Sequence, residues 1–216
     1  YNPLLLLAET GMEDRHKEKQ WEIYYSYIQW MKSHFPMIKT IAISSRPYHE
    51  GGCDCCSELA YSFSQLIEIC SFLMEKGLTI QELSHLIFFE FHTDSNLFME
   101  AAKLRAARIL FANIMDELGA DISNIKIDIY SRGSKRNKTV YDPYANMLRS
   151  ATETFSAVLG GADRIHTCHF NEAFQISTPF SRRIARNQQL ILKEESRFHF
   201  IADPGAGSWY RSEERR

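Results

Sequence analysis

Four short runs rich in β-branched and aromatic residues are accompanied by side chains suited to acid–base or ligand chemistry. Tyr48 and His49 follow the first run, His92 follows the second, Arg132 follows the third and His166 lies in the fourth. The carboxyl ends of parallel strands share one edge of an α/β sheet, and active sites gather there. We therefore expect these side chains to lie along one edge of a parallel sheet.

Imidazoles and carboxylates from several strand ends can converge on one ion, as in metal-dependent barrel hydrolases. No His-x-His or His-Glu-x-x-His spacing in the chain supports such a site. We therefore expect no metal site and keep the hydrolase only as an alternative.

Two further motifs carry weak signals. Cys53-Asp-Cys-Cys56 has a C-x-x-C spacing at the start of a predicted helix, where the helix N-terminus lowers a thiol pKa. One such pair cannot close a structural zinc site, which needs about four ligands, so packed cysteines are favoured. The basic loop from Ser131 to Lys138 could hold a phosphate, but it lacks the Walker spacing and is more typical of a solvated turn.

The elements that must position these residues alternate between strands and helices. The starts of the β-rich runs lie roughly 40 residues apart, which suits one strand plus one crossover helix. The predicted strands are Ile38–Ser44, Leu86–Phe91, Ile125–Tyr130 and Arg164–Cys168.

Apolar residues at spacings of 3 and 4 predict the helices between the strands. Asp142 and Pro143 are typical of a helix start, and Gly160-Gly161 of its end. The predicted stripes cover residues 21–35, 59–73, 97–118 and 144–158, and a last helix runs from Thr178 to about Ser196. One helix followed by four βα units predicts an α/β fold with parallel strands, either doubly wound or part of a (β/α)8 barrel. We expect one domain over residues 1–216.

Composition excludes several classes of protein. Lys and Arg number 25 and Asp and Glu 27, a net charge of −2, which argues against nucleic acid as a partner. The longest N-terminal apolar run, Leu4 to Ala8, is too short for a membrane span. Five cysteines, three of them crowded together, favour a reducing cytoplasm. The start at Tyr1 and the polar end from Arg211 suggest a piece of a longer protein.

Several long motifs, in the same order, resemble the adenosylcobalamin-dependent methylmalonyl-CoA mutase family. The segment Phe98–Arg108 matches that family's helix F-M-E-x-A-K-L-R-A-x-R. The segment Asp203–Tyr210 resembles its D-P-x-x-G-S-x-Y motif. Further matches are Asp142–Arg149, Phe155–Gly161, Arg183–Asn187 and Glu194–Ser196, so that the resemblance covers roughly residues 38–210.

This resemblance implies a (β/α)8 TIM barrel that binds a CoA ester along its axis, followed by a cobalamin-binding domain. The four βα units would then be the C-terminal half of the barrel, strands five to eight. The family's cobalamin motif, D-x-H-x-x-G, is absent from residues 1–216. We therefore expect a single partial domain without the cobalamin-binding domain.

The resemblance also implies a degenerate site, like that of the family's small, non-catalytic chains. Arg46 and Pro47 stand where catalytic chains have the Tyr-His pair that faces cobalamin and substrate, and Tyr48-His49 matches the small-chain pattern Y-H-x-x-G. In the R-L-S-F-F run that contacts CoA, His85 and Ile87 replace the Arg and the Ser. Arg132 replaces the amide that contacts substrate, so the positions implied to face substrate or cofactor are held by Arg46, His49, His85, Arg132 and His166.

Lost CoA contacts and a blocked axis would prevent the mutase from holding a thioester and controlling radicals. The expected role is therefore a structural partner of a catalytic large subunit in a heterodimer. That complex would interconvert methylmalonyl-CoA and succinyl-CoA in propionate metabolism, with no adenosylcobalamin on this chain alone and with self-association of the half barrel. The alternative is a catalytic acyl-CoA mutase of altered substrate range that uses Tyr48, His49 and Arg132.

Overall fold

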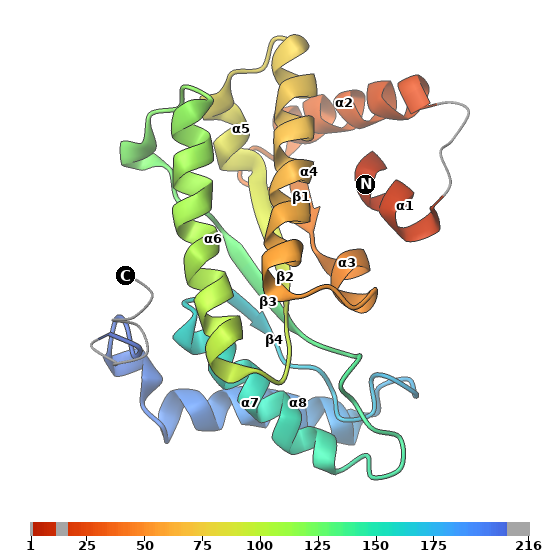
Figure 1. Ribbon diagram of the computed structural model, residues 1–216, viewed down its shortest axis with the longest axis vertical. Helices are drawn as coiled ribbons and strands as arrows, with labels where there is room; N and C mark the ends of the chain where they lie inside the picture. Colours follow the sequence, from red (N-terminus) through yellow and green to blue (C-terminus); the bar gives the residue numbers. More distant parts are fainter. Residues whose placement is uncertain (1, 12–16, 207–216) are drawn as a thin grey trace. The chain divides into compact units, whose positions relative to one another are not determined.

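The strands form one parallel sheet in the computed structural model, which describes residues 2–11 and 17–206. Within these residues the sheet has four strands in the order β1-β2-β3-β4 (Figure 1). Ile41 lies opposite Ile87, and Tyr130 lies opposite Arg164. The strands are β1 (Ile41–Ser44), β2 (Ile87–Thr93), β3 (Ile129–Gly133) and β4 (Arg164–His166). The α/β class is confirmed, and the parallel order is consistent with half of a (β/α)8 barrel.

Local capping explains where several helices begin. Asn2 and Asp54 accept hydrogen bonds from the first backbone N–H groups of α1 and α4. Thr79 and Glu82 form a capping box at α5, and Thr178 caps α8 ahead of Pro179. The helices are α1 (Pro3–Thr10), α2 (Lys17–His34), α3 (Arg46–Glu50), α4 (Cys55–Glu75), α5 (Ile80–Leu86), α6 (Leu97–Glu117), α7 (Ala145–Leu159) and α8 (Pro179–Glu194), with 3-10 turns η1 (Ile122–Asn124) and η2 (Phe198–Phe200).

The chain divides into two compact units, and the first comprises residues 1–90 and 107–129. Its core joins the sheet to α4 and α6, because the Phe89 ring lies 5.1 Å from Phe63 and 5.8 Å from Phe111. The predicted apolar stripe on α4 is buried, which confirms that helix and its inward face. Its five residues are Leu59, Phe63, Leu66, Cys70 and Leu73. Trp21 of α2 packs on Phe72 of α4 at 4.6 Å between ring centroids.

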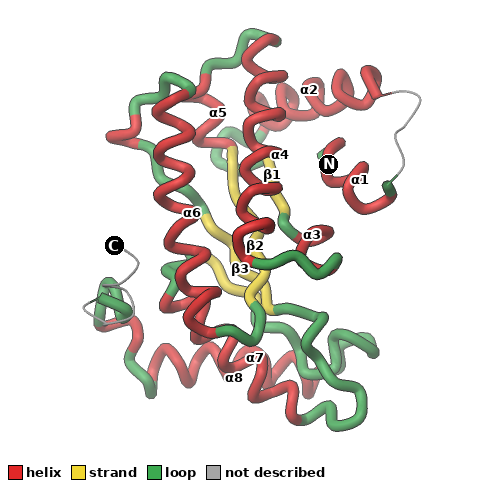
Figure 2. Tube along the Cα trace, in the orientation of Figure 1, coloured by secondary structure: helices red, strands yellow, loops and turns green. Residues whose placement is uncertain are grey.

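The second unit comprises residues 91–106 and 130–216. Its helices α7 and α8 pack on one another, and α7 also contacts β4. Long irregular segments, green in Figure 2, join β3 to α7 and β4 to α8. Gly160 ends α7 where a Cβ atom would lie only 2.8 Å from Leu104, so a close helix contact requires glycine there.

The structure corrects several sequence predictions. His92 lies within β2 and not after it. The third strand begins at Ile129 rather than Ile125, because η1 ends at Asn124 and residues 125–128 are irregular. Arg132 therefore lies within β3 and not after it. Helix α7 begins at Ala145, without a side-chain cap from Asp142, and its buried face is polar where an apolar stripe was expected.

No helix among residues 2–11 and 17–206 is long and apolar enough to cross a membrane.

Candidate functional site

The first group of candidate residues lies on α3, directly after β1. Pro47 near the N-terminus of α3 fixes the helical start, and Ser45 precedes it as the N-cap. His49 is only 1% exposed, and its Nδ1 lies 3.3 Å from Oε2 of Glu58, which is equally buried. Ser45 donates a hydrogen bond of 2.5 Å to the other oxygen of Glu58. This imidazole is therefore held inside the first unit by a buried carboxylate.

Tyr48 is held by a second network in the same unit. Gln65 of α4 donates to the Tyr48 hydroxyl at 2.9 Å and accepts from Nδ2 of Asn2 at 3.2 Å. Nδ2 of Asn2 also reaches the carbonyl of Ala42 in β1 at 2.9 Å. The Tyr48 ring lies 5.0 Å from that of Tyr61. The Tyr-His pair of the sequence thus belongs to the packing between β1, α1 and α4.

Arg46 and His85 also lie in the first unit, in different settings. Arg46 forms an ion pair with Glu9 of α1, and this hydrogen bond raises the pKa of the Arg46 guanidinium. His85 is exposed on α5, before β2 begins, and so lies at the amino end of that strand. Arg46 and His85 therefore do not lie beside one another.

The second group surrounds Glu172, in the loop between β4 and α8. Its Oε1 accepts a hydrogen bond of 2.5 Å from Nη2 of Arg132 in β3. Its Oε2 lies 3.5 Å from Nε2 of His166 and 3.4 Å from Nδ1 of His169. Burial acts to raise the pKa of Glu172, but the His166 and Arg132 side chains outweigh it and hold this pKa well below its usual range. The structure thus brings the predicted Arg132 and His166 together on one carboxylate.

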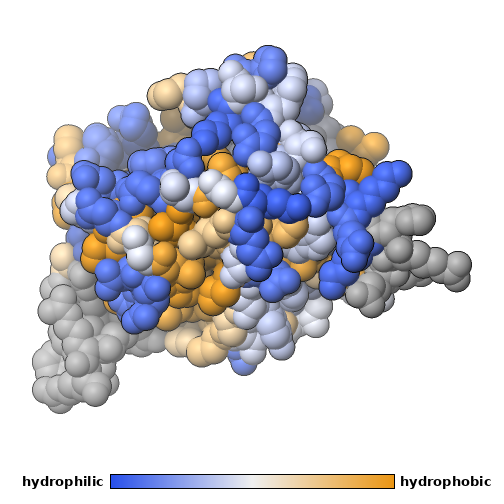
Figure 3. All heavy atoms as spheres, turned by 90° about the horizontal axis from the view of Figure 1, so that it is seen from above, coloured by the Kyte–Doolittle hydropathy of each residue, from blue (hydrophilic) through white to orange (hydrophobic). Residues whose placement is uncertain are grey.

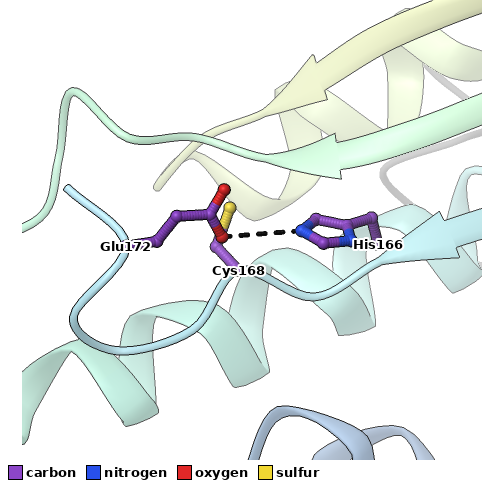
Figure 4. Close-up of side chains that lie close together, drawn as sticks. All are labelled: His166, Cys168 and Glu172. Atoms are coloured by element: carbon purple, nitrogen blue, oxygen red, sulfur yellow. Dashed lines mark ion pairs between the residues drawn. The ribbon is translucent and has the colours of Figure 1, made fainter. Parts of the chain in front are cut away.

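Cys168 completes this second group (Figure 4). Ligand atoms of His166, Cys168 and Glu172 all lie within 4.8 Å of one another. The Cys168 thiol is 1% exposed and donates to the carbonyl oxygen of Gly133 at 2.9 Å. Burial raises the pKa of this thiol to about 12. An open cavity of about 630 Å³ is lined by His166, His169 and Glu172 among others, and gives solvent access to these side chains.

A buried ion pair lies next to these residues in the second unit. Nζ of Lys138 is 2.5 Å from Oε1 of Glu153 on α7, and the two side chains are 0% and 2% exposed. Asn137 donates to the same oxygen at 2.6 Å. Burial raises the pKa of Glu153, although Lys138 and Asn137 act to lower it. Lys138 of the basic loop after β3 therefore has a structural role and is not available to a phosphate.

Sequence reasoning singled out His166 but missed Cys168, Glu172 and Glu153. The signal for the first two was the spacing His-x-Cys-His-x-x-Glu from His166 to Glu172, which follows a short strand. Glu153 carried no such signal, because it is not part of the apolar stripe predicted for its helix, although the structure buries it.

A family model and the individual relatives of this chain indicate the same protein family. The family model described as methylmalonyl-CoA mutase matches residues 10–213. The chain is 40% identical over 177 residues to a methylmalonyl-CoA mutase small subunit from Porphyromonas gingivalis, covering 81% of this chain and 29% of that protein.

Mutases that are not described as small subunits are similar to nearly the same degree. A methylmalonyl-CoA mutase from Rhizobium meliloti is 38% identical over 194 residues, covering 89% of this chain and 27% of that protein. One from Escherichia coli is 36% identical over 184 residues, covering 85% and 26%. The chain thus spans less than a third of the length of these curated relatives.

Proposed function

Because this chain belongs to the methylmalonyl-CoA mutase family, we propose that it acts as a non-catalytic partner in an adenosylcobalamin-dependent mutase complex. Its partner would be a catalytic large subunit in a cytoplasmic heterodimer that interconverts methylmalonyl-CoA and succinyl-CoA. Residues 1–216 would form one partial domain, the second half of the barrel.

The burial of His49 carries this proposal. An imidazole that is 1% exposed and held by Glu58 cannot reach a thioester without disrupting the packing of the first unit. Tyr48 is likewise engaged by Gln65. A catalytic acid or base must come within hydrogen-bond reach of the proton that it moves.

The family depends on cobalamin, but the residues at the positions implied to face the cofactor do not fit that group. His49 is buried, Arg46 is paired with Glu9, and Arg132 is committed to Glu172. We therefore assign cofactor binding to the catalytic partner. A titration of the folded chain with adenosylcobalamin should give no saturable spectral change, and stoichiometric binding would contradict the assignment.

Exposed apolar side chains support a role in assembly. Phe35, Met37 and Ile38 of the first unit are 45%, 93% and 50% exposed, and Figure 3 shows apolar residues gathered at the surface. Apolar side chains gathered at a surface are typical of a protein–protein contact.

Turnover by the assembled complex tests the non-catalytic role. Tyr48→Phe removes only the hydroxyl, and His49→Gln keeps a hydrogen-bonding side chain beside Glu58. We expect both variants to retain parental turnover per mole of complex, as should the matched control His34→Ala at the exposed end of α2. If Tyr48→Phe and His49→Gln assemble normally but turnover falls about 10²-fold or more, as loss of general acid–base catalysis would produce, the chain is catalytic.

A further inference from the structure

The end of β4 and the loop after it bring together three possible metal ligands: an imidazole nitrogen, a thiol sulfur and a carboxylate oxygen. His166, Cys168 and Glu172 each offer one such atom, all within 4.8 Å of one another. Imidazole, thiolate and carboxylate are together the donors that zinc and similar divalent ions prefer. We propose that His166, Cys168 and Glu172 bind a divalent transition-metal ion of borderline softness, such as zinc.

The backbone explains why side chains two and six residues apart in sequence converge. Residues alternate sides along an extended chain, so His166 and Cys168 point one way and Thr167 the other. Thr167 does face away, because its hydroxyl lies 2.7 Å from that of Thr154 on α7. The backbone N–H of Glu172 then donates to the carbonyl of His169 at 3.0 Å, and this turn returns the carboxylate to the strand end.

The two oxygens of Glu172 are divided between two tasks. Oε1 is held by Arg132, as a partner outside the coordination sphere often holds a ligating carboxylate. Oε2 accepts a hydrogen bond of 3.2 Å from the backbone N–H of His169 and lies 3.5 Å from Nε2 of His166. Nε2 of His166 is buried and makes no hydrogen bond within the described part of the chain, so its 3.5 Å contact with Glu172 is a long one. An ion between these atoms would give that nitrogen a direct ligand bond.

Binding requires the thiolate of Cys168. The thiol proton, which now lies toward the carbonyl of Gly133, would pass to solvent as the sulfur–metal bond forms. The open cavity of about 630 Å³ that reaches His166 and Glu172 provides an entry path for the ion. This site does not revive the hydrolase alternative, because its three ligands come from the end of β4 and the loop after it and not from several strand ends.

The experiment uses the full chain in a background where Cys53, Cys55 and Cys56 are replaced by Ser, because that thiol cluster could bind metal by itself. Calorimetric titration with Zn²⁺ should show one equivalent bound. Titration with Co²⁺ should show a thiolate-to-cobalt charge-transfer band in the near ultraviolet. Absence of stoichiometric binding in this background would overturn the proposal.

Single variants then locate the ion. Cys168→Ser should abolish the charge-transfer band, and Glu172→Gln should weaken Zn²⁺ binding at least about 10-fold, since even an outer partner is worth 10–100-fold. His85→Ala, a surface imidazole in the other unit, should leave affinity unchanged. A charge-transfer band that persists in folded Cys168→Ser would overturn the assignment.

Thermal unfolding provides a readout that does not depend on the mutase complex. Excess Zn²⁺ should raise Tm in the cysteine-depleted background, because a ligand that binds only the native state stabilises it. The same Zn²⁺ concentration should raise Tm less in the Glu172→Gln variant, because a weaker site stabilises the native state less, and this tests the site even where Cys168→Ser does not fold. Failure of these tests would leave the non-catalytic role untouched, since turnover of the complex is measured separately.

Discussion

Breaking the buried ion pair between Lys138 and Glu153 should destabilise the chain more than any exposed pair. Both side chains are at most 2% exposed, and Nζ lies 2.5 Å from Oε1. Lys138→Met would leave a buried carboxylate with Asn137 as its remaining donor to that oxygen. Loss of one partner of a buried pair costs about 3–5 kcal/mol. At ~2–4 °C per kcal/mol for a chain of this size, Tm should fall by roughly 6–20 °C.

The stability lost in Lys138→Met should increase as pH rises. Burial raises the pKa of Glu153, so the native state binds this proton more tightly than the unfolded chain. Stability from this group therefore falls as pH rises from the unfolded pKa to the folded one. Without Lys138 the folded pKa rises further, so the deficit of Lys138→Met relative to the parent should be small near pH 4.5 and complete near neutrality.

Urea unfolding followed by circular dichroism at both pH values measures this effect. The double variant Lys138→Met/Glu153→Leu removes both charges and should recover most of the lost stability. Lys76→Met, which breaks the exposed pair with Glu22, is the matched control and should leave the midpoint close to that of the parent. A loss below about 1 kcal/mol in Lys138→Met, or one that is independent of pH, would refute the reasoning.

Two other outcomes can be measured with the same protein. Thr79→Ala removes the hydrogen bond from the Glu82 backbone N–H to the Thr79 side chain at the start of α5. It should cost about 1 kcal/mol of stability, seen as a Tm lower by roughly 2–4 °C. An unchanged Tm would mean that the Glu82 side chain alone caps the helix. Strands β1 and β4 each have a neighbour on one side only within the described sheet, so we expect the purified chain to self-associate. Light scattering that gives a monomer across micromolar concentrations would contradict that expectation.

The fold was predictable where one physical preference dominated. The stripe on α4 was identified correctly because an apolar face at helical spacing has one stable location, against the sheet. The alternation of strands and helices fixed the parallel order for a similar reason. The helix start at Thr178-Pro179 was also correct, since both residues carry the local capping geometry themselves.

The misses occurred where long-range polar contacts decide the structure. Helix α7 buries Asn146 and Glu153 because the loops after β3 and β4 supply their partners, and no local pattern encodes those contacts. The convergence of Cys168 and Glu172 likewise depends on a turn at His169 that residue types do not specify. Periodicity predicts which face is apolar, but it cannot predict that a polar face will be buried once its partners are provided.

The order of the sheet has a consequence for biosynthesis. Each strand after β1 pairs with the strand made just before it, so a partner is already present when that strand is made. Each pairing closes a loop of similar length, and doubling such a loop costs only ~0.6 kcal/mol. The entropy of loop closure therefore allows the strands to pair in the order in which they are translated. The sheet can grow one strand at a time as the polypeptide leaves the ribosome, with each new strand added at the edge left by the strand before it.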